Sequence, residues 1–99
     1  MSSKKGIYRA RLADVPVEKE FRCHGGGNFR NLEQLAYALR GMSEESFSYH
    51  VTEQNNDFSN WIQDVIGDSA LAKSLKTVNN RNQARRIVEE RIAWLRARI

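Results

Sequence analysis

The sequence predicts an α+β fold, in which a small sheet is covered by helices. Two short segments, 18–24 and 46–52, alternate apolar and polar residues, which is typical of strands with one buried face. Four longer segments repeat apolar residues every three to four positions, as amphipathic helices do. At 99 residues the chain suits one domain with a small core. We expect a single compact domain over 6–99, preceded by a mobile arm over 1–5.

The strand predictions differ in strength. The segment 46–52 is the clearest, because three apolar residues share one face: Phe47, Tyr49 and Val51. In 18–24 the apolar face is reduced to Phe21 and Cys23. A helix between the two segments favours a right-handed crossover and parallel pairing. Since two parallel strands make a poor sheet, residues 7–12 or a second subunit are the candidates for a third strand.

Three consecutive glycines, Gly25 to Gly27, predict a turn, because they suit the interior of neither a helix nor a strand. Together with His24 they match the HGGG sequence that forms the oxyanion hole of some esterases. An esterase would also need a G-x-S-x-G nucleophile motif, which is absent. A phosphate-binding P-loop would need Lys-Ser/Thr after Gly27, which is absent. We interpret the stretch as a plain turn, with an anion at the start of the following helix as the alternative.

Four helices are expected, at 31–41, 57–66, 69–76 and 80–98. Each begins at, or shortly after, a side chain that can accept a hydrogen bond from the first turn of a helix: Asn31, Asn55 or Asn56, Asp68 and Asn80. Trp61 belongs to the apolar stripe of its helix, so we expect it in the core.

The last helix carries an arginine in its apolar face. At about 100° per residue, Arg91 falls among apolar residues such as Val88 and Leu95. A buried guanidinium requires a partner. We therefore expect Arg91 either to pair with a carboxylate from residues 43–72 or to mark a contact with another chain. Trp94, at the rim of the same arc, is expected to be half-exposed.

The net charge of +4 is unevenly distributed along the chain. Residues 1–42 carry eight Lys/Arg and four acids, residues 43–72 carry six acids and no Lys/Arg, and residues 73–99 carry eight Lys/Arg and two acids. The three segments are therefore +4, −6 and +6. Either the acidic middle neutralises the basic tail inside the fold, or the basic residues form one outward face for a polyanion.

The leading functional hypothesis is a non-enzymatic module whose N-terminal arm and last helix contact the phosphates of RNA or DNA. The candidate contacts are Lys4, Lys5, Arg9, Arg11, Lys73, Lys76, Arg81, Arg85, Arg86 and Arg96. Trp94, Tyr8 and Phe29 are the candidates for stacking on bases. The alternative is a protein-binding or homodimerising module that uses the apolar arc of the last helix. Its candidate interface is Arg91, Trp94, Leu95 and Ile99.

The two histidines and the single cysteine are the remaining candidates for chemistry. Pairing of the two predicted strands would place His24 and His50 beside Arg22 in a polar-face patch, although hydrogen-bonded structural histidines are the simpler interpretation. A structural zinc site needs four Cys/His ligands, so no metal site is predicted. Cys23 is expected to be an inert core thiol. Because no nucleophile, base and orienting group converge, we expect neither an enzyme nor a cofactor or small-molecule substrate.

The stretch FSYHVTEQNNDFSNWIQDVIGD, residues 47–68, resembles a small prokaryotic family described as a domain of unknown function. The family's pattern is F-x-[YF]-H, then N-D-F-x-x-W-I-x-D-x-x-G-D and a helical tail. The matching residues are Phe47, Tyr49, His50, Asn56, Asp57, Phe58, Trp61, Ile62, Asp64, Gly67 and Asp68. The resemblance covers about residues 18–98. It implies one compact unit and brings no activity, cofactor or catalytic residue with it.

The expected location is the cytoplasm. No apolar run approaches the roughly 18 residues of a membrane span, and the first residues lack the apolar block of a signal peptide. One cysteine cannot form an internal disulfide. We therefore expect no membrane contact.

Overall fold

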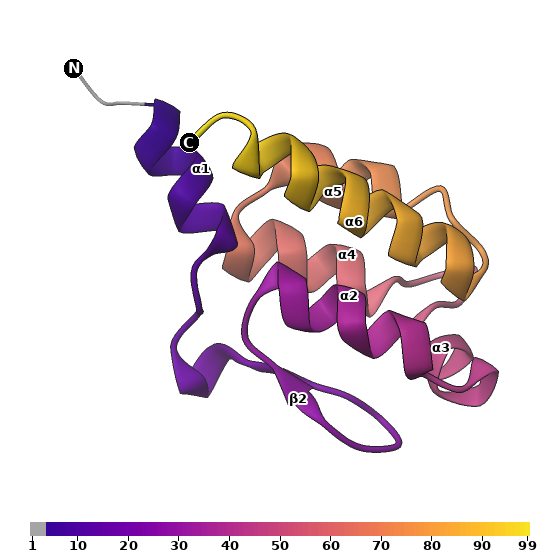
Figure 1. The fold of residues 1–99 in the computed structure, drawn as a ribbon. Helices are drawn as coiled ribbons and strands as arrows, with labels where there is room; N and C mark the ends of the chain where they lie inside the picture. The colour runs from indigo at the N-terminus through magenta and orange to yellow at the C-terminus, as the bar shows by residue number, and fades with distance from the viewer. Residues whose placement is uncertain (1–3) are drawn as a thin grey trace.

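The computed structural model describes residues 4–99 and is shown in Figure 1. The fold is mostly helical with one two-stranded antiparallel sheet, which places it in the α+β class. Element η1 is a 3₁₀ turn and η2 is a π-helical turn. In chain order the elements are α1 (Lys4–Leu12), η1 (Val17–Lys19), β1 (Phe21–Arg22), β2 (Asn28–Phe29), α2 (Leu32–Gly41), α3 (Glu44–His50), α4 (Asp57–Trp61), η2 (Ile62–Ile66), α5 (Ser69–Leu75) and α6 (Arg81–Arg96).

The four predicted helices are present as α2, α4 with η2, α5 and α6, and their ends lie within about two residues of the predicted ones. In each case the predicted cap accepts a hydrogen bond from the backbone N–H three residues later: Asn31 from Gln34, Asn56 from Ser59, Asp68 from Leu71 and Asn80 from Gln83. Local capping chemistry therefore determines where these helices begin.

The helix predicted at 57–66 changes its hydrogen-bond pattern halfway. After α4, the chain widens into the π-helical turn η2. The Ile62 carbonyl accepts hydrogen bonds from the N–H groups of Gly67 at 2.8 Å and Asp68 at 3.2 Å. Gly67 has a φ of +86°, a left-handed conformation that favours glycine, and it ends the helix. The π-helical turn η2 therefore places Asp68 at the start of α5.

The strand predicted at 46–52 is wrong, because this segment belongs mostly to helix α3. Ser43 caps the helix, and two glutamates in the first turn place negative charge at its positive end. Phe47 and His50, three residues apart, are buried on one helical face, whereas Tyr49 is 60% exposed. The alternation in the sequence therefore did not reflect burial.

Residues 7–12 do not form a third strand either. They belong to helix α1, in which Tyr8 and Leu12 are four residues apart and pack against the core. The predicted mobile arm over 1–5 overlaps this helix, since Lys4 and Lys5 are its first residues. Residues 1–3 of that arm lie outside the described part of the chain.

The sheet is a short hairpin rather than a parallel pair. Within the predicted strand 18–24, only Phe21–Arg22 forms a strand. This strand pairs antiparallel with β2, with Phe21 opposite Phe29. The predicted crossover is therefore wrong, because the partner strand follows directly after the glycines and not after the helix.

The three glycines form the turn of this hairpin, as predicted. All three have positive φ, between +78° at Gly27 and +123° at Gly26, which glycine adopts without strain. A Cβ at Gly25 would collide with the hydroxyl of Ser46. The positive φ of Gly25 and the close approach of the turn to the first turn of α3 together favour glycine at this position.

Helices α2 and α6 lie side by side at the centre of the molecule, α5 packs against α6 from behind, and α1 crosses the end near the C-terminus (Figure 1). Below them, the hairpin covers an aromatic cluster in which Phe21 stacks on Phe29 and Phe58. Trp61 is 8% exposed, so its predicted core position is confirmed. Within residues 4–99, no helix has the length and apolar character needed to cross a membrane.

Candidate functional site

Arg81, a predicted phosphate contact, is used inside the fold. Its Nη1 donates hydrogen bonds to the carbonyls of Leu39 and Arg40, both at 2.7 Å, where α2 ends. Its Nε lies 3.3 Å from a carboxylate oxygen of Glu44 at the start of α3. The last carbonyls of a helix have no partner within it, so Arg81 satisfies the end of α2 from the other half of the chain. With a side chain 20% exposed, it offers little to a phosphate.

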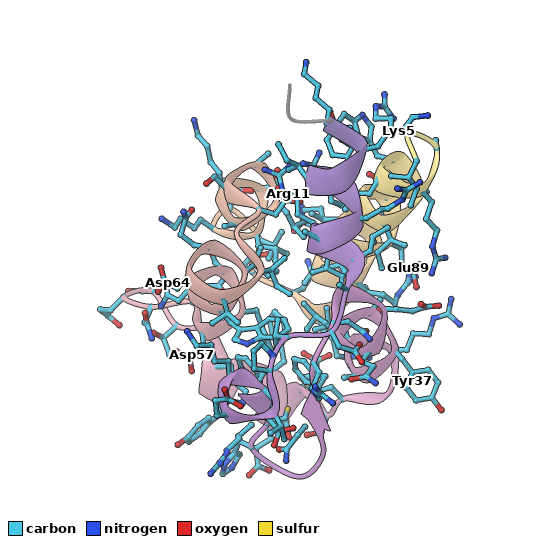
Figure 2. The ribbon with its side chains drawn as sticks, turned by 90° about the vertical axis from the view of Figure 1, so that its left-hand side faces the viewer. Lys5, Arg11, Tyr37, Asp57, Asp64 and Glu89 are labelled. Atoms are coloured by element: carbon cyan, nitrogen blue, oxygen red, sulfur yellow. The ribbon has the colours of Figure 1, made fainter. Side chains whose placement is uncertain are left out.

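Two further predicted contacts on the same side of α6 are ion-paired. Arg85 lies 2.8 Å from Glu89, and Arg96 lies 2.8 Å from Glu33 of α2. Glu89, labelled in Figure 2, also lies 3.1 Å from Arg40 of α2. The side of α6 that faces α2 is therefore largely neutralised by acids of α2, α3 and α6 itself.

The partner of Arg91 is Asp68. The Arg91 Nε and Nη2 donate to the two carboxylate oxygens of Asp68 at 2.7 and 3.0 Å. The Asp68 side chain is fully buried and that of Arg91 is 17% exposed. The same carboxylate accepts the N–H of Leu71 at 3.2 Å and so caps α5. The prediction that Arg91 pairs with a carboxylate from residues 43–72 is confirmed.

The side chains of six predicted cationic contacts have neither an ion-pair nor a hydrogen-bond partner among residues 4–99: Lys4, Arg9, Arg11, Lys73, Lys76 and Arg86. They belong to α1, to the end of α5 and to the solvent side of α6. Figure 2 shows Lys5 and Arg11 on opposite sides of α1. Positive charge that the fold does not neutralise is thus concentrated on these three helices.

A groove of about 730 Å³ runs between α5 and α6. Lys73 lines one wall, and Lys76 follows it one helical turn later. Ile87 lines the other wall, directly after Arg86 in the chain. Glu90 also lines this wall and is the one acid among the lining residues. The groove is therefore lined by one unpaired cation, Lys73, with Lys76 and Arg86 nearby in the chain, and by one acid.

Trp94, at the end of this groove, is 37% exposed, as expected for a rim residue. The guanidinium carbons of Arg98 and Arg91 lie 3.7 and 4.3 Å from its ring centre. The ring of Tyr8 meets it edge-on at 5.3 Å. These three side chains occupy the surface on which a base would stack. Phe29, another predicted stacking residue, is buried in the core at 2% exposure.

The predicted interface on the last helix is only partly at the surface. Leu95 is fully buried against the core, and Arg91 is held by Asp68. Trp94 and Ile99 remain partly exposed. Because the chain's own elements cover the centre of the apolar arc, this face offers a second chain only its margin.

The predicted polar-face patch is wrong in its geometry. His50 is 5% exposed and lies in the core, where its Nε2 accepts the backbone N–H of His24 at 2.9 Å. Its Nδ1 lies 3.0 Å from an oxygen of Asp57, and a neutral ring protonated at Nδ1 satisfies both contacts. The His24 ring is exposed and stacks on Tyr49 at 3.9 Å. Arg22 is exposed and makes no ion pair within residues 4–99.

The Asp57–His50 pair is oriented like an acid–base dyad, but the Nε2 atom of His50 already accepts the His24 N–H. The hydrogen bonds of His50 to His24 and Asp57 therefore connect the hairpin to α3 and α4.

Cys23 is half-buried at the edge of the core rather than inside it. Burial raises the pKa of the Cys23 thiol, which disfavours the reactive thiolate. Within residues 4–99, no three His, Cys, Asp or Glu side chains are grouped to hold a metal ion.

One surface, centred on Tyr37 of α2, was not predicted from the sequence. This side chain is 80% exposed and stands beside a hollow of about 800 Å³ between the glycine turn, α2 and α3. In Figure 2 it points away from the body of the molecule. A signal was present, because Tyr37 falls outside the apolar stripe formed by Leu32, Leu35 and Leu39. A large aromatic side chain on a polar helix face is such a signal.

Comparison with protein-family models, with curated proteins and with solved structures gives no match for this chain. The resemblance seen in residues 47–68 therefore stays a prediction. Four of the matching residues stabilise the fold, since Phe58 and Trp61 are buried in the core and Asn56 and Asp68 cap helices.

Proposed function

We propose that this protein is a non-enzymatic, cytoplasmic module that binds the phosphate backbone of RNA or DNA along α1 and the α5–α6 groove. The proposal rests on which cations have a partner inside the fold and which do not. Arginines facing α2 or the core have acid or carbonyl partners, whereas six cations on α1, α5 and α6 have none among residues 4–99. Unpaired cations can contact phosphates without giving up an internal ion pair.

The distribution of acids supports the same direction of approach. Seven acids make no ion pair within residues 4–99: Asp14, Glu18, Glu20, Glu45, Glu53, Asp64 and Glu90. Of these, Glu90 belongs to α6, and the other six lie outside α1, α5 and α6. A polyanion is therefore attracted to one part of the surface and repelled from the other.

The groove favours backbone contacts over base recognition. The hydroxyls of Ser74 and Thr77 donate to the carbonyls of Ala70 and Ser74, at 3.1 and 2.9 Å, so their protons are already used. Trp94 is covered by two guanidinium groups. The available donors are therefore ammonium and guanidinium groups, which bind phosphates regardless of base sequence.

The test is fluorescence anisotropy of labelled duplex DNA and RNA at about 50 and about 200 mM salt, across which a protein that makes six phosphate contacts loses about 10³-fold in affinity. The variant Lys73→Glu/Arg86→Glu should weaken binding and make the salt dependence shallower by about two contacts. The matched control is Lys19→Glu/Arg22→Glu, which changes two exposed cations outside the groove by the same charge. Glu90→Gln should tighten binding, because it removes the acid that lines the groove.

Two results would overturn the proposal. One is the absence of binding to either nucleic acid at the lower salt concentration. The other is an equal loss of affinity in the groove variant and in its control, which would mean that net charge alone determines binding.

A further inference from the structure

Helix α2 presents an exposed face that the nucleic-acid proposal does not use. Tyr37 stands on this face between two hollows, one of about 800 Å³ towards the glycine turn and α3, and one of about 360 Å³ towards α6. Glu33 also lines both hollows. At 80% exposure, Tyr37 is the most exposed large apolar side chain among residues 4–99. Tyrosine is enriched in protein interfaces and often carries much of their binding energy.

The larger hollow extends one helical turn beyond Tyr37. Gly41, four residues later on α2, lines it together with Ala38 and Met42. A Cβ built on Gly41 would meet nothing within 4 Å, so the absence of a side chain there serves no internal contact. Glycine costs about 1 kcal/mol relative to alanine in a helix interior, and Gly41, the last residue of α2, lacks a positive φ that would require glycine. The helix thus carries a protruding ring and, beside it, a recess to which α2 contributes the small residues Ala38 and Gly41.

We propose that a second copy of this chain docks on this face, with the two α2 helices antiparallel across a two-fold axis near Tyr37. In this arrangement the Tyr37 ring of each copy enters the hollow beside Gly41 of the other. A two-fold interface requires one surface that complements itself, and the ring and recess on the same helix face meet that requirement.

Charge selects the antiparallel arrangement. Glu33 lies at the start of α2 and Arg40 near its end, with side chains 69% and 65% exposed. Antiparallel packing places Glu33 of each copy opposite Arg40 of the other, whereas parallel packing would place like charges together. Each side chain already has an ion-pair partner on α6, Arg96 and Glu89 respectively, so the new contacts extend existing pairs into alternating networks.

This proposal is independent of nucleic-acid binding, because the α2 face and the α5–α6 groove share no lining residue. It also differs from self-association through the last helix, whose central residue Leu95 is buried. The partner is a second copy and not an unrelated protein, since both the recess and the ring that fits it come from this chain.

The test is sedimentation velocity of the full chain at up to about 0.2 mM, which detects dissociation constants of about 1–100 µM. The wild type should form a dimer. Tyr37→Glu should weaken dimerisation at least about 100-fold, because both symmetry-related contacts are lost. Gly41→Trp fills the recess, keeps Tyr37 and should weaken it similarly. Val17→Glu, which changes a residue 59% exposed on η1, is the control and should dimerise like the wild type.

Charge exchange tests the orientation. Glu33→Arg should weaken the dimer, and Glu33→Arg/Arg40→Glu should restore it, because the paired reversal recreates opposite charges across the two-fold axis. The proposal is overturned if the wild type stays monomeric over the whole range, or if Tyr37→Glu and Gly41→Trp dimerise as tightly as the wild type. It is also overturned if Val17→Glu weakens the dimer equally. Circular dichroism of each variant confirms that a monomeric result comes from a folded chain.

Discussion

The ion pair between Asp68 and Arg91 should account for a large share of the stability of this small fold. We would change Asp68 in two ways. Asp68→Ser removes the charge but keeps a hydroxyl that can still cap α5, whereas Asp68→Ala removes both the charge and the cap. The two variants therefore separate the two roles of a carboxylate that is fully buried and accepts hydrogen bonds from both Arg91 and the N–H of Leu71.

The magnitudes follow from burial. Removing one partner of a buried pair costs about 3–5 kcal/mol. Because the Arg91 side chain is 17% exposed, it can reach water after the change, so we expect Asp68→Ser to cost about 3 kcal/mol. Loss of the cap should add about 1 kcal/mol in Asp68→Ala. A domain of this size has an unfolding free energy of about 5–15 kcal/mol, so both effects are large.

Urea and thermal unfolding would measure both variants, and Asp68→Ser should lower the midpoint temperature by about 12–24 °C. Glu33→Ser is the matched control, because it breaks an exposed pair in which the Arg96 and Glu33 side chains are 54% and 69% exposed. It should cost less than about 1 kcal/mol. If Asp68→Ser cost no more than this control, the reasoning about the buried pair would be refuted. Equal losses in the serine and alanine variants would refute the capping role.

Three further predictions concern the hairpin. His50→Phe should lower the unfolding free energy by about 2–3 kcal/mol in thermal unfolding, because it leaves the His24 N–H and the Asp57 carboxylate without their partner. An unchanged midpoint would contradict this role. Gly25→Ala should cost about 1–3 kcal/mol, because its φ of +92° is strained for alanine and its Cβ meets the Ser46 hydroxyl. Gly41→Ala, which meets nothing, should be neutral or stabilising in the same assay. Burial raises the pKa of the Cys23 thiol, so the unfolded chain loses this proton first and the unfolding free energy should fall as the pH rises through the ordinary thiol range. Cys23→Ser should lack this decrease, and iodoacetamide should modify native Cys23 more slowly than the unfolded chain. Equal modification rates would show that the thiol is not protected.

The features that could be predicted from the sequence are those encoded within one or two helical turns. Asn31, Asp68 and Asn80 each stand directly before an apolar stripe, and each caps the helix expected there. The position of Arg91 within an apolar arc also predicted a carboxylate partner correctly, because a buried guanidinium permits few alternatives.

The strand predictions failed where a short segment fits two periodicities. In 46–52, Phe47 and Tyr49 suggest alternation, but Phe47 and His50 are also one helical turn apart. Ser43 and the acids after it signalled a helix start at the same place. Alternation over so few residues does not distinguish a strand from a helix, and tertiary contacts decided between them.

The pairing of cations could not be read from the chain, because it depends on which helices become neighbours. Arg81 reaches the end of α2 only because α6 packs along that helix in the reverse direction. The charges of the three segments add up to the net charge of the chain, but they do not show on which helices positive charge is left unpaired. The recess beside Tyr37 likewise depends on how the glycine turn and α3 are placed beside α2.

The capping of α2 by Arg81 has a consequence for synthesis in the cell. Helices α2 and α5 are complete by residue 75, but the carbonyls that end α2 and the carboxylate that starts α5 find their arginine partners only in α6. In a nascent chain stopped at residue 80, these groups would have only water as a partner, and the apolar faces that α6 covers would be exposed. We therefore expect α2 and α5 to reach their native stability only after residues 81–96 have been synthesised.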